Sequence, residues 1–214
     1  MAAAASSSSK TPEPQIEISK IGTETLLVPI IGSSPLITHR FSEKAKRQML
    51  DAMQGRKNPK APKDPEAEYQ AAAYRLDDGG YACPAIAFKS ATVSAARFFD
   101  KSVSMVGLRQ TLFFGGEMSK TEGQLMVRID GEPEMREDVV RVGNGGTDLR
   151  YRPMFAEWTA TLEVTYVSSM LTRESVLSLI EAGGLGVGVG EWRPEKRGDM
   201  GTYAIDQTRQ VEVV

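Results

Sequence analysis

The sequence contains very little of the two residue types on which much enzyme chemistry depends: it has one histidine, His39, and one cysteine, Cys83. A lone cysteine excludes a disulfide bond within the chain, and a Ser-His-Asp or Cys-His site could be built only around His39. A typical zinc site needs several His or Cys ligands. We therefore expect no metal and no cofactor, and a reducing, cytosolic compartment is the simplest interpretation.

An apolar run long enough to span a membrane is also absent, as is an excess of charge of either sign. No stretch of about 18 apolar residues occurs, and residues 1–10 lack the basic start and long apolar segment of a secretory signal. The 26 Lys and Arg residues and 28 Asp and Glu residues give a formal net charge of −2. Any nucleic-acid surface must therefore be a local patch.

The chain length is sufficient for one domain with a substantial core, at 214 residues. Residues 1–15 are small and polar, which predicts a disordered tail. We expect residues 16–214 to form a single α+β domain. Residues 55–65 are polar, basic and rich in proline, a composition typical of a mobile loop within that domain.

Hydrophobic periodicity predicts the secondary structure. The clearest strand is 155–167, where apolar residues such as Leu162 and Val164 alternate with threonines and a glutamate. Other strands are expected at 16–31, 68–76, 108–114, 125–129 and 201–205. Helices are expected at 42–54, 84–99 and 173–182, and a long loop at 131–152. Each half of this order resembles a split βαβ unit, which predicts an α+β, ferredoxin-like antiparallel sheet with helices packed on one face.

Four glycines alternate with other residues in the segment 184–190, which directly follows the third expected helix. Gly183-Gly184 is expected to end that helix. A dinucleotide-binding glycine loop follows a strand and opens a helix, and the P-loop ending Gly-Lys-Ser/Thr is absent, so nucleotide binding is not favoured. Two interpretations stay open: a strand whose glycines allow close backbone approach, or a loop whose bare amides contact a nucleic-acid backbone.

A basic segment runs from Arg40 to Lys63 and holds eight Lys or Arg residues against Glu43 and Asp51. It is either a solvated helix face and loop or a phosphate-binding patch. Lys and Arg residues elsewhere, together with the indole of Trp192, could complete a surface that binds phosphates and stacks on bases. The candidate nucleic-acid-binding residues are Arg40, Lys44, Lys46, Arg47, Arg56, Lys57, Lys60, Lys63, Lys89, Arg97, Trp192, Arg193 and Lys196.

Acidic residues gather at Glu132, Glu134, Glu137 and Asp138, with arginines interleaved. Carboxylates can bind metals, but the neighbouring arginines favour salt bridges or solvation. We do not expect a metal site in this segment.

Six ordered motifs resemble a family of conserved bacteriophage and prophage proteins. They lie at 35–50, 84–91, 135–143, 149–152, 157–158 and 188–196, the last reading Gly-Val-Gly-Glu-Trp-Arg-Pro-Glu-Lys. The resemblance extends over about residues 26–206. It implies a phage protein that acts in the host cytoplasm, but the family has no established function.

Two segments are also similar to the RAMP superfamily, the ferredoxin-like proteins that form the RNA-binding backbone of CRISPR effector complexes. These are Cys83-Pro-Ala-Ile-Ala-Phe-Lys-Ser-Ala91, and Gly184–Gly190 followed by Gly201-Thr-Tyr203. Glu191-Trp-Arg-Pro194 interrupts the glycine-rich part of the pattern. The resemblance implies a RAMP-like fold that binds single-stranded nucleic acid.

Three functions follow as hypotheses. The first is a non-catalytic protein that binds single-stranded DNA or RNA and oligomerises along the strand. The second is an assembly or anti-defence protein that binds a phage or host protein. The third is a RAMP-type endoribonuclease that uses His39 as general acid or base, because the pKa of a histidine suits that role near neutral pH.

Overall fold

The structure of the chain is a computed structural model that describes residues 20–56, 62–100, 103–142 and 146–214. The expected disordered tail therefore lies outside the described residues, as do Lys57 and Lys60. The side chain of Lys44 lies outside them too.

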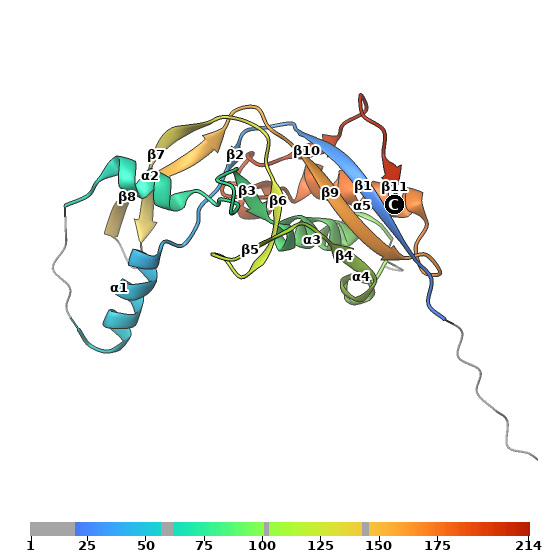
Figure 1. Cartoon of the computed structure of the whole chain (residues 1–214), viewed down its shortest axis with the longest axis horizontal. Helices are drawn as coiled ribbons and strands as arrows, with labels where there is room; N and C mark the ends of the chain where they lie inside the picture. The colour runs from blue at the N-terminus through green and yellow to red at the C-terminus, as the bar shows by residue number, and fades with distance from the viewer. Residues whose placement is uncertain (1–19, 57–61, 101–102, 143–145) are drawn as a thin grey trace, which may run out of the picture.

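The main sheet has the ferredoxin-like strand order. Its strands are β1 (Thr23–Gly32), β4 (Leu112–Phe114), β9 (Thr159–Val167) and β10 (Tyr203–Ile205). They lie in the order β10-β1-β9-β4 with every neighbouring pair antiparallel, and β11 (Glu212–Val213) also pairs with β1. Helix α3 (Ala85–Ser94) lies between β1 and β4 in the chain, and α5 (Arg173–Gly186) lies between β9 and β10 (Figure 1). This βαββαβ arrangement confirms the predicted α+β fold class.

The remaining elements are insertions into this framework. Those between β1 and α3 are β2 (Leu36–Ile37), α1 (Glu43–Met53), α2 (Pro65–Ala72) and β3 (Ala82–Pro84). Those between α3 and β9 are η1 (Ala95–Phe98), α4 (Met105–Thr111), β5 (Glu117–Ser119), β6 (Gln124–Arg128), β7 (Pro133–Val142) and β8 (Gly146–Phe155), and η2 (Pro194–Lys196) follows α5. The inserted strands form two smaller sheets, β2-β8-β7 and β3-β6-β5.

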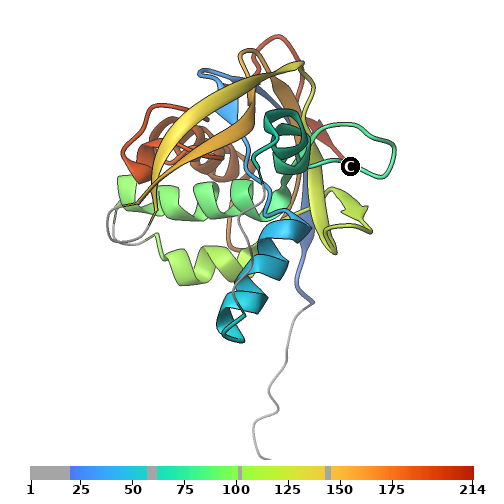
Figure 2. The ribbon, with the colours of Figure 1, turned by 90° about the vertical axis from the view of Figure 1, so that its left-hand side faces the viewer.

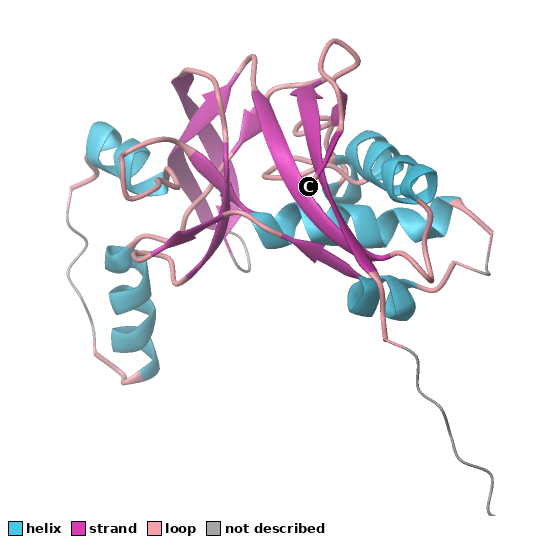
Figure 3. Ribbon diagram, turned by 45° about the vertical axis from the view of Figure 1, so that its right-hand side comes forward, coloured by secondary structure: helices cyan, strands magenta, loops and turns pink. Residues whose placement is uncertain are grey.

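The core lies between the main sheet and the helices α3 and α5, which pack against each other on one face of the sheet (Figure 3). Alternate residues of the two central strands are fully buried, among them Val28 on β1 and Leu162 on β9. They pack with Phe88 of α3 and Ile180 of α5 in one hydrophobic cluster. Because burial stabilises by about 25 cal/mol per Å² of apolar surface, this cluster holds helices and sheet together. The alternation predicted for 155–167 is confirmed.

The prediction that Gly183-Gly184 ends the helix is wrong, since α5 continues to Gly186. A Cβ on Gly183 would lie 2.9 Å from the backbone of Ala91, and one on Gly184 would lie 2.1 Å from the carbonyl oxygen of Tyr203. The glycines therefore serve close approach of α5 to α3 and β10 rather than termination. The strand interpretation of 184–190 is also wrong, because an irregular turn follows the helix.

The loop expected at 131–152 is instead occupied by two long paired strands, β7 and β8, which form a ribbon (Figure 2). Its register pairs Pro133 with Phe155 and Val142 with Gly146. Charged residues occur on both faces of this ribbon, so the sequence lacks the apolar alternation that marks a half-buried strand.

Two further expected strands are helical in whole or in part. Helix α2 replaces most of the strand at 68–76, and the Asp64 side chain caps it by accepting from the Ala67 amide at 3.1 Å. Helix α4 occupies the first part of 108–114 and leaves three residues for β4, with Ser104 as its cap.

We expect Gly183→Ala to lower the free energy of unfolding by about 1–3 kcal/mol, because the added methyl overpacks the contact with α3. The matched control is Gly107→Ala in α4, where a Cβ would meet only Ser104 atoms at 3.7 Å or more. That variant should be more stable by about 0.5–1 kcal/mol because alanine favours the helix. Chemical denaturation measures both, and equal effects of the two substitutions would contradict the packing role of Gly183.

Candidate nucleic-acid interface

A turn at residues 187–193, here called the glycine turn, follows α5 and is hydrogen-bonded to strand β2. The Glu191 amide donates to the Ile37 carbonyl oxygen at 2.8 Å. A Cβ on Gly190 would lie 2.4 Å from that same oxygen, and Gly190 has a φ of 75°. Glycine is therefore required here both for the backbone conformation and for the close approach.

Trp192 has an unusual backbone conformation within the glycine turn. Its φ is 55°, although it is a bulky residue, and its side chain is 44% exposed. The Met200 amide donates to its carbonyl oxygen at 3.0 Å, and a Cβ on Gly198 would lie 1.8 Å from that oxygen. The left-handed conformation costs about 1–2 kcal/mol in a residue other than glycine, and such strain is often found at ligand sites. The backbone is thus held in place while the indole faces outward.

Three arginines and an aspartate occupy one face of the β7–β8 ribbon, and we call them the arginine cluster. Arg136 lies opposite Arg152 across the ribbon, and Asp138 lies opposite Arg150. The Asp138 carboxylate accepts from Arg152 Nη2 at 2.6 Å and from Arg136 Nε at 2.9 Å. Residues two apart on a strand share a face, which explains why Arg-x-Asp and Arg-x-Arg produce this arrangement.

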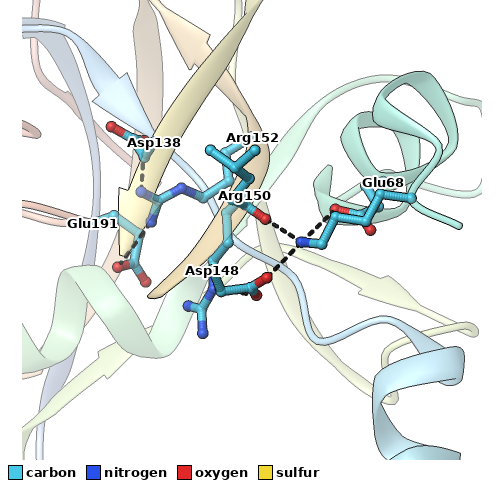
Figure 4. Close-up of polar contacts among 8 residues, drawn as sticks. Glu68, Asp138, Asp148, Arg150, Arg152 and Glu191 are labelled. Carbon is cyan, nitrogen blue, oxygen red and sulfur yellow. Dashed lines mark hydrogen bonds and ion pairs between the residues drawn. The ribbon is translucent and has the colours of Figure 1, made fainter. Parts of the chain in front are cut away.

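Arg152 connects the arginine cluster to the glycine turn. Its side chain is 2% exposed, and its Nη1 lies 3.4 Å from a Glu191 carboxylate oxygen (Figure 4). Its Nε has no hydrogen-bond partner among the residues that the structure describes. A buried guanidinium must be paired, and here Asp138 supplies the short bond and Glu191 the long one.

His39 lies close to this connection. Its ring stacks on Phe41 with a centroid separation of 6.2 Å. Partial burial lowers the pKa of His39 below its ordinary value; the nearby Arg150 and Arg152 guanidiniums lower it too, whereas the Glu191 carboxylate acts in the opposite direction. The neutral imidazole is therefore favoured. The single cysteine, Cys83, is buried, and this burial raises the pKa of its thiol to about 12.

The structure brings some of the predicted site residues together near Trp192. Arg193 donates to the Gly190 carbonyl oxygen at 2.9 Å, and both Arg193 and Arg97 pair with Glu195, at 3.0 and 3.8 Å. Lys196 belongs to the same segment and is exposed. Glu195 therefore brings Arg97 to Arg193, which directly follows Trp192 in the chain.

The other predicted residues are distributed over separate elements. Arg40 is 13% exposed and pairs with Glu122, so its charge is largely compensated inside the protein. Lys63 pairs with Asp148 at 2.6 Å and with Glu68 at 3.7 Å, and donates to the Leu149 carbonyl oxygen (Figure 4). The remaining described candidates are Lys46, paired with Glu43 at 2.8 Å; Arg56, 3.7 Å from Asp51; Lys89, which donates to the Arg109 carbonyl oxygen at 3.0 Å; and Arg47, which is exposed.

Sequence reasoning did not select Arg150, Arg152 or Glu191 as site residues. The interpretation of Asp138 as a salt-bridged residue is confirmed, but the ribbon that makes its ion pairs was predicted as a loop. The signal was present in the alternate placement of charges at 136, 138, 150 and 152, which fits the period of a strand.

Two negative findings apply to the described part of the chain. No three of its His, Cys, Asp or Glu residues are grouped so that they could hold a metal ion. None of its helices combines the length and apolar character needed to cross a bilayer.

Comparisons with known proteins give structural neighbours but no family. No protein-family model matches the sequence, and no curated protein matches it. The chain is similar in structure to Cmr6 from Pyrococcus furiosus, with 12% identity, 87% of this chain and 100% of that chain covered, and a TM-score of 0.42. It is also similar to a chain of the Type III-B Cmr-beta complex bound to cognate target RNA, with 9% identity, 90% and 61% coverage, and a TM-score of 0.47.

We expect Asp138→Asn to destabilise the fold by about 3–5 kcal/mol, because it leaves the buried Arg152 guanidinium without its short ion pair. Asp148→Asn is the matched control on the same ribbon. Its pair with Lys63 is exposed to solvent, so the loss should stay below about 1 kcal/mol. Urea denaturation measures both variants, and an Asp138→Asn effect no larger than the control would disprove a structural role for the buried pair.

The single histidine allows its titration to be followed without assignment, by the imidazole proton resonances in NMR. We expect a pKa below the ordinary value of about 6.5. Glu191→Gln should lower the pKa further because it removes a charge that favours the imidazolium, whereas Arg150→Gln should raise it. Shifts of the opposite sign would mean that these residues do not surround His39 as described.

Proposed function

We propose that the chain binds single-stranded nucleic acid at the surface where the segment 37–41 meets the glycine turn. The observation that carries the proposal is Trp192, which is exposed on a strained backbone and is followed in the chain by Arg193, Lys196 and Arg197. Aromatic side chains that stack on bases, together with cations that track the phosphates, are the features of sequence-tolerant single-strand binding. The exposed ring of Phe41 provides a second stacking face on the adjoining segment.

The charge distribution supports a local rather than a general nucleic-acid surface. The protein has a net charge of −2, and several of its cations are paired with acids. Lys196, Arg197 and Arg97 are exposed, and Arg193, the residue after Trp192, is partly exposed. Binding should therefore involve few phosphates and weaken as salt concentration rises.

We propose a binding role without catalysis. His39 is the alternative catalytic group of the endoribonuclease hypothesis, and its ring is partly buried against Phe41. Among the described residues, no titratable side chain forms a hydrogen bond with His39 that could serve as its partner in proton transfer. The phage origin and the action in a host cytoplasm stay part of the proposal on the sequence resemblance alone.

We expect Trp192→Ala to weaken binding of fluorescein-labelled oligouridylate or oligothymidylate by about 5- to 150-fold, the range for loss of one stacked base. Fluorescence anisotropy at low salt measures the affinity. Met118→Ala is the matched control, because it removes an exposed apolar side chain on β5. The labelled strand should stay intact during the measurement.

A second readout comes from the two tryptophans, since Trp158 is buried and Trp192 is exposed. Oligonucleotide should quench part of the wild-type emission and none of the emission of Trp192→Phe, which can still stack. Absence of binding to both DNA and RNA at low salt would refute the proposed function. Equal affinities of Trp192→Ala and the control would remove Trp192 from the site.

Self-association is the second candidate function, and two apolar surfaces favour it. Helix α1 projects from one end of the molecule and exposes Met49, Leu50 and Met53, the last to 80% (Figure 1). A groove of about 970 Å³ lies beside α5 and is lined by Leu177, Leu185 and Ile205, among others. The two surfaces lie on different sides of the molecule, so they could meet only between two copies. Such a heterologous contact can extend from copy to copy along a strand.

We expect Met53→Glu and Leu185→Glu each to prevent assembly, because each places a charge in the contact. A mixture of the two variants should form dimers, since every copy keeps one intact surface. Light scattering measures the particle mass, with Val139→Glu as the control for an exposed apolar residue outside both surfaces. A wild-type monomer at all concentrations, with or without oligonucleotide, would refute self-association.

A further inference from the structure

The ion pairs of Arg152 are unequal, and the weaker one involves a residue that is open to solvent. Asp138 bonds Nη2 at 2.6 Å and is itself buried. Glu191 lies 3.4 Å from Nη1, and its side chain is 44% exposed. Asp138 uses its other oxygen for Arg136, so Nε of Arg152 is left without an acceptor. The guanidinium therefore has donor capacity that the described residues do not fill.

The backbone of the glycine turn is held without help from the contact between Glu191 and Arg152. The Glu191 amide bonds to the Ile37 carbonyl oxygen, and Gly190 and Trp192 on either side have φ values of 75° and 55°. The side chain could therefore move to solvent while the turn keeps its conformation. The position that it would leave faces Nη1 of Arg152. Arg150 lies two residues before Arg152 on the same face of β8, and its contact with Asp148 is long, at 4.0 Å.

We propose that Glu191 occupies a phosphate site formed by Arg150 and Arg152, and that it acts there as an internal anion that a phosphodiester group displaces. The inference rests on the proposed function for the identity of the natural ligand. A phosphate offers several acceptor oxygens and a full negative charge, so it can replace the long Glu191 contact with charge-assisted hydrogen bonds. Trp192 is the next residue in the chain, so a base beside the bound phosphate would be close to the exposed indole.

The proposal makes Glu191 an inhibitor of binding rather than a ligand. The isosteric variant Glu191→Gln removes the competing charge and should bind a fluorescein-labelled oligouridylate of about twelve nucleotides roughly tenfold more tightly. Arg150→Gln should bind about tenfold more weakly, with a salt slope about 0.7 smaller in a log–log plot, because one phosphate contact is lost. Glu174→Gln, an exposed residue in the first turn of α5, controls for the change in net charge.

The NMR signal of His39 reports whether the anion occupies this site. Titration of Glu191→Gln with the oligouridylate should shift the imidazole resonances. If wild type and Glu191→Gln bind equally and His39 does not shift, the phosphate site is refuted while nucleic-acid binding stands. If no oligonucleotide binds, inorganic pyrophosphate is titrated instead. A His39 shift at millimolar or lower pyrophosphate in Glu191→Gln, but not in Glu174→Gln, would then support the phosphate site, while the absence of oligonucleotide binding would contradict the proposed function. No shift with either probe refutes the site.

Discussion

The burial of the Arg152 guanidinium is the constraint on which the arrangement around the candidate interface depends. Removing a cation from water costs several kcal/mol unless carboxylates compensate it. The two that do so here are Asp138 on β7 and Glu191 in the glycine turn, far apart in sequence. The inserted β7–β8 ribbon is thereby tied to the turn that follows the second helix of the ferredoxin-like framework. Two distant parts of the chain therefore each contribute a carboxylate to one buried guanidinium beside the candidate interface.

The glycine turn determines which of its side chains face the buried arginine and which face solvent. Gly190 approaches β2 too closely for any side chain, and the residues on either side of Glu191 have left-handed backbones. One consequence is that Glu191 faces Arg152 while Trp192 faces solvent. The same few residues therefore determine both the electrostatics of the interior and the aromatic group available to a ligand. A replacement in this turn should therefore alter both the ion pairing of Arg152 and the exposure of Trp192.

Much of the framework could be predicted from sequence because half-buried strands show their period directly. The alternation around Leu162 and the helix predicted from residue 173 both appear in the structure. The end of α5 could not be predicted from the propensity of glycine, because packing against Ala91 and Tyr203 overrides it. The β7–β8 ribbon was missed because its exposed and buried faces both carry charges, which hides the apolar alternation.

The site was harder to predict than the fold, since its decisive contacts are between residues distant in sequence. The basic segment 40–63 predicted one patch, yet Arg40 pairs with Glu122 and Lys63 with Asp148, both from later insertions. Composition cannot show which charges are compensated by distant partners. Trp192 and Arg193 were predicted as site residues because they follow the glycine-rich segment. The structure adds that Trp192 is exposed and that its backbone is strained.

Photochemical cross-linking tests the central claim most directly. An oligonucleotide with 4-thiouridine at every position would be irradiated with the full-length protein and the cross-linked peptides identified by mass spectrometry. The account predicts cross-links at Trp192 or in the segment 37–41, whose first residue, Ile37, is hydrogen-bonded to the glycine turn. Cross-links confined to other elements, such as α4 or the groove beside α5, would contradict it.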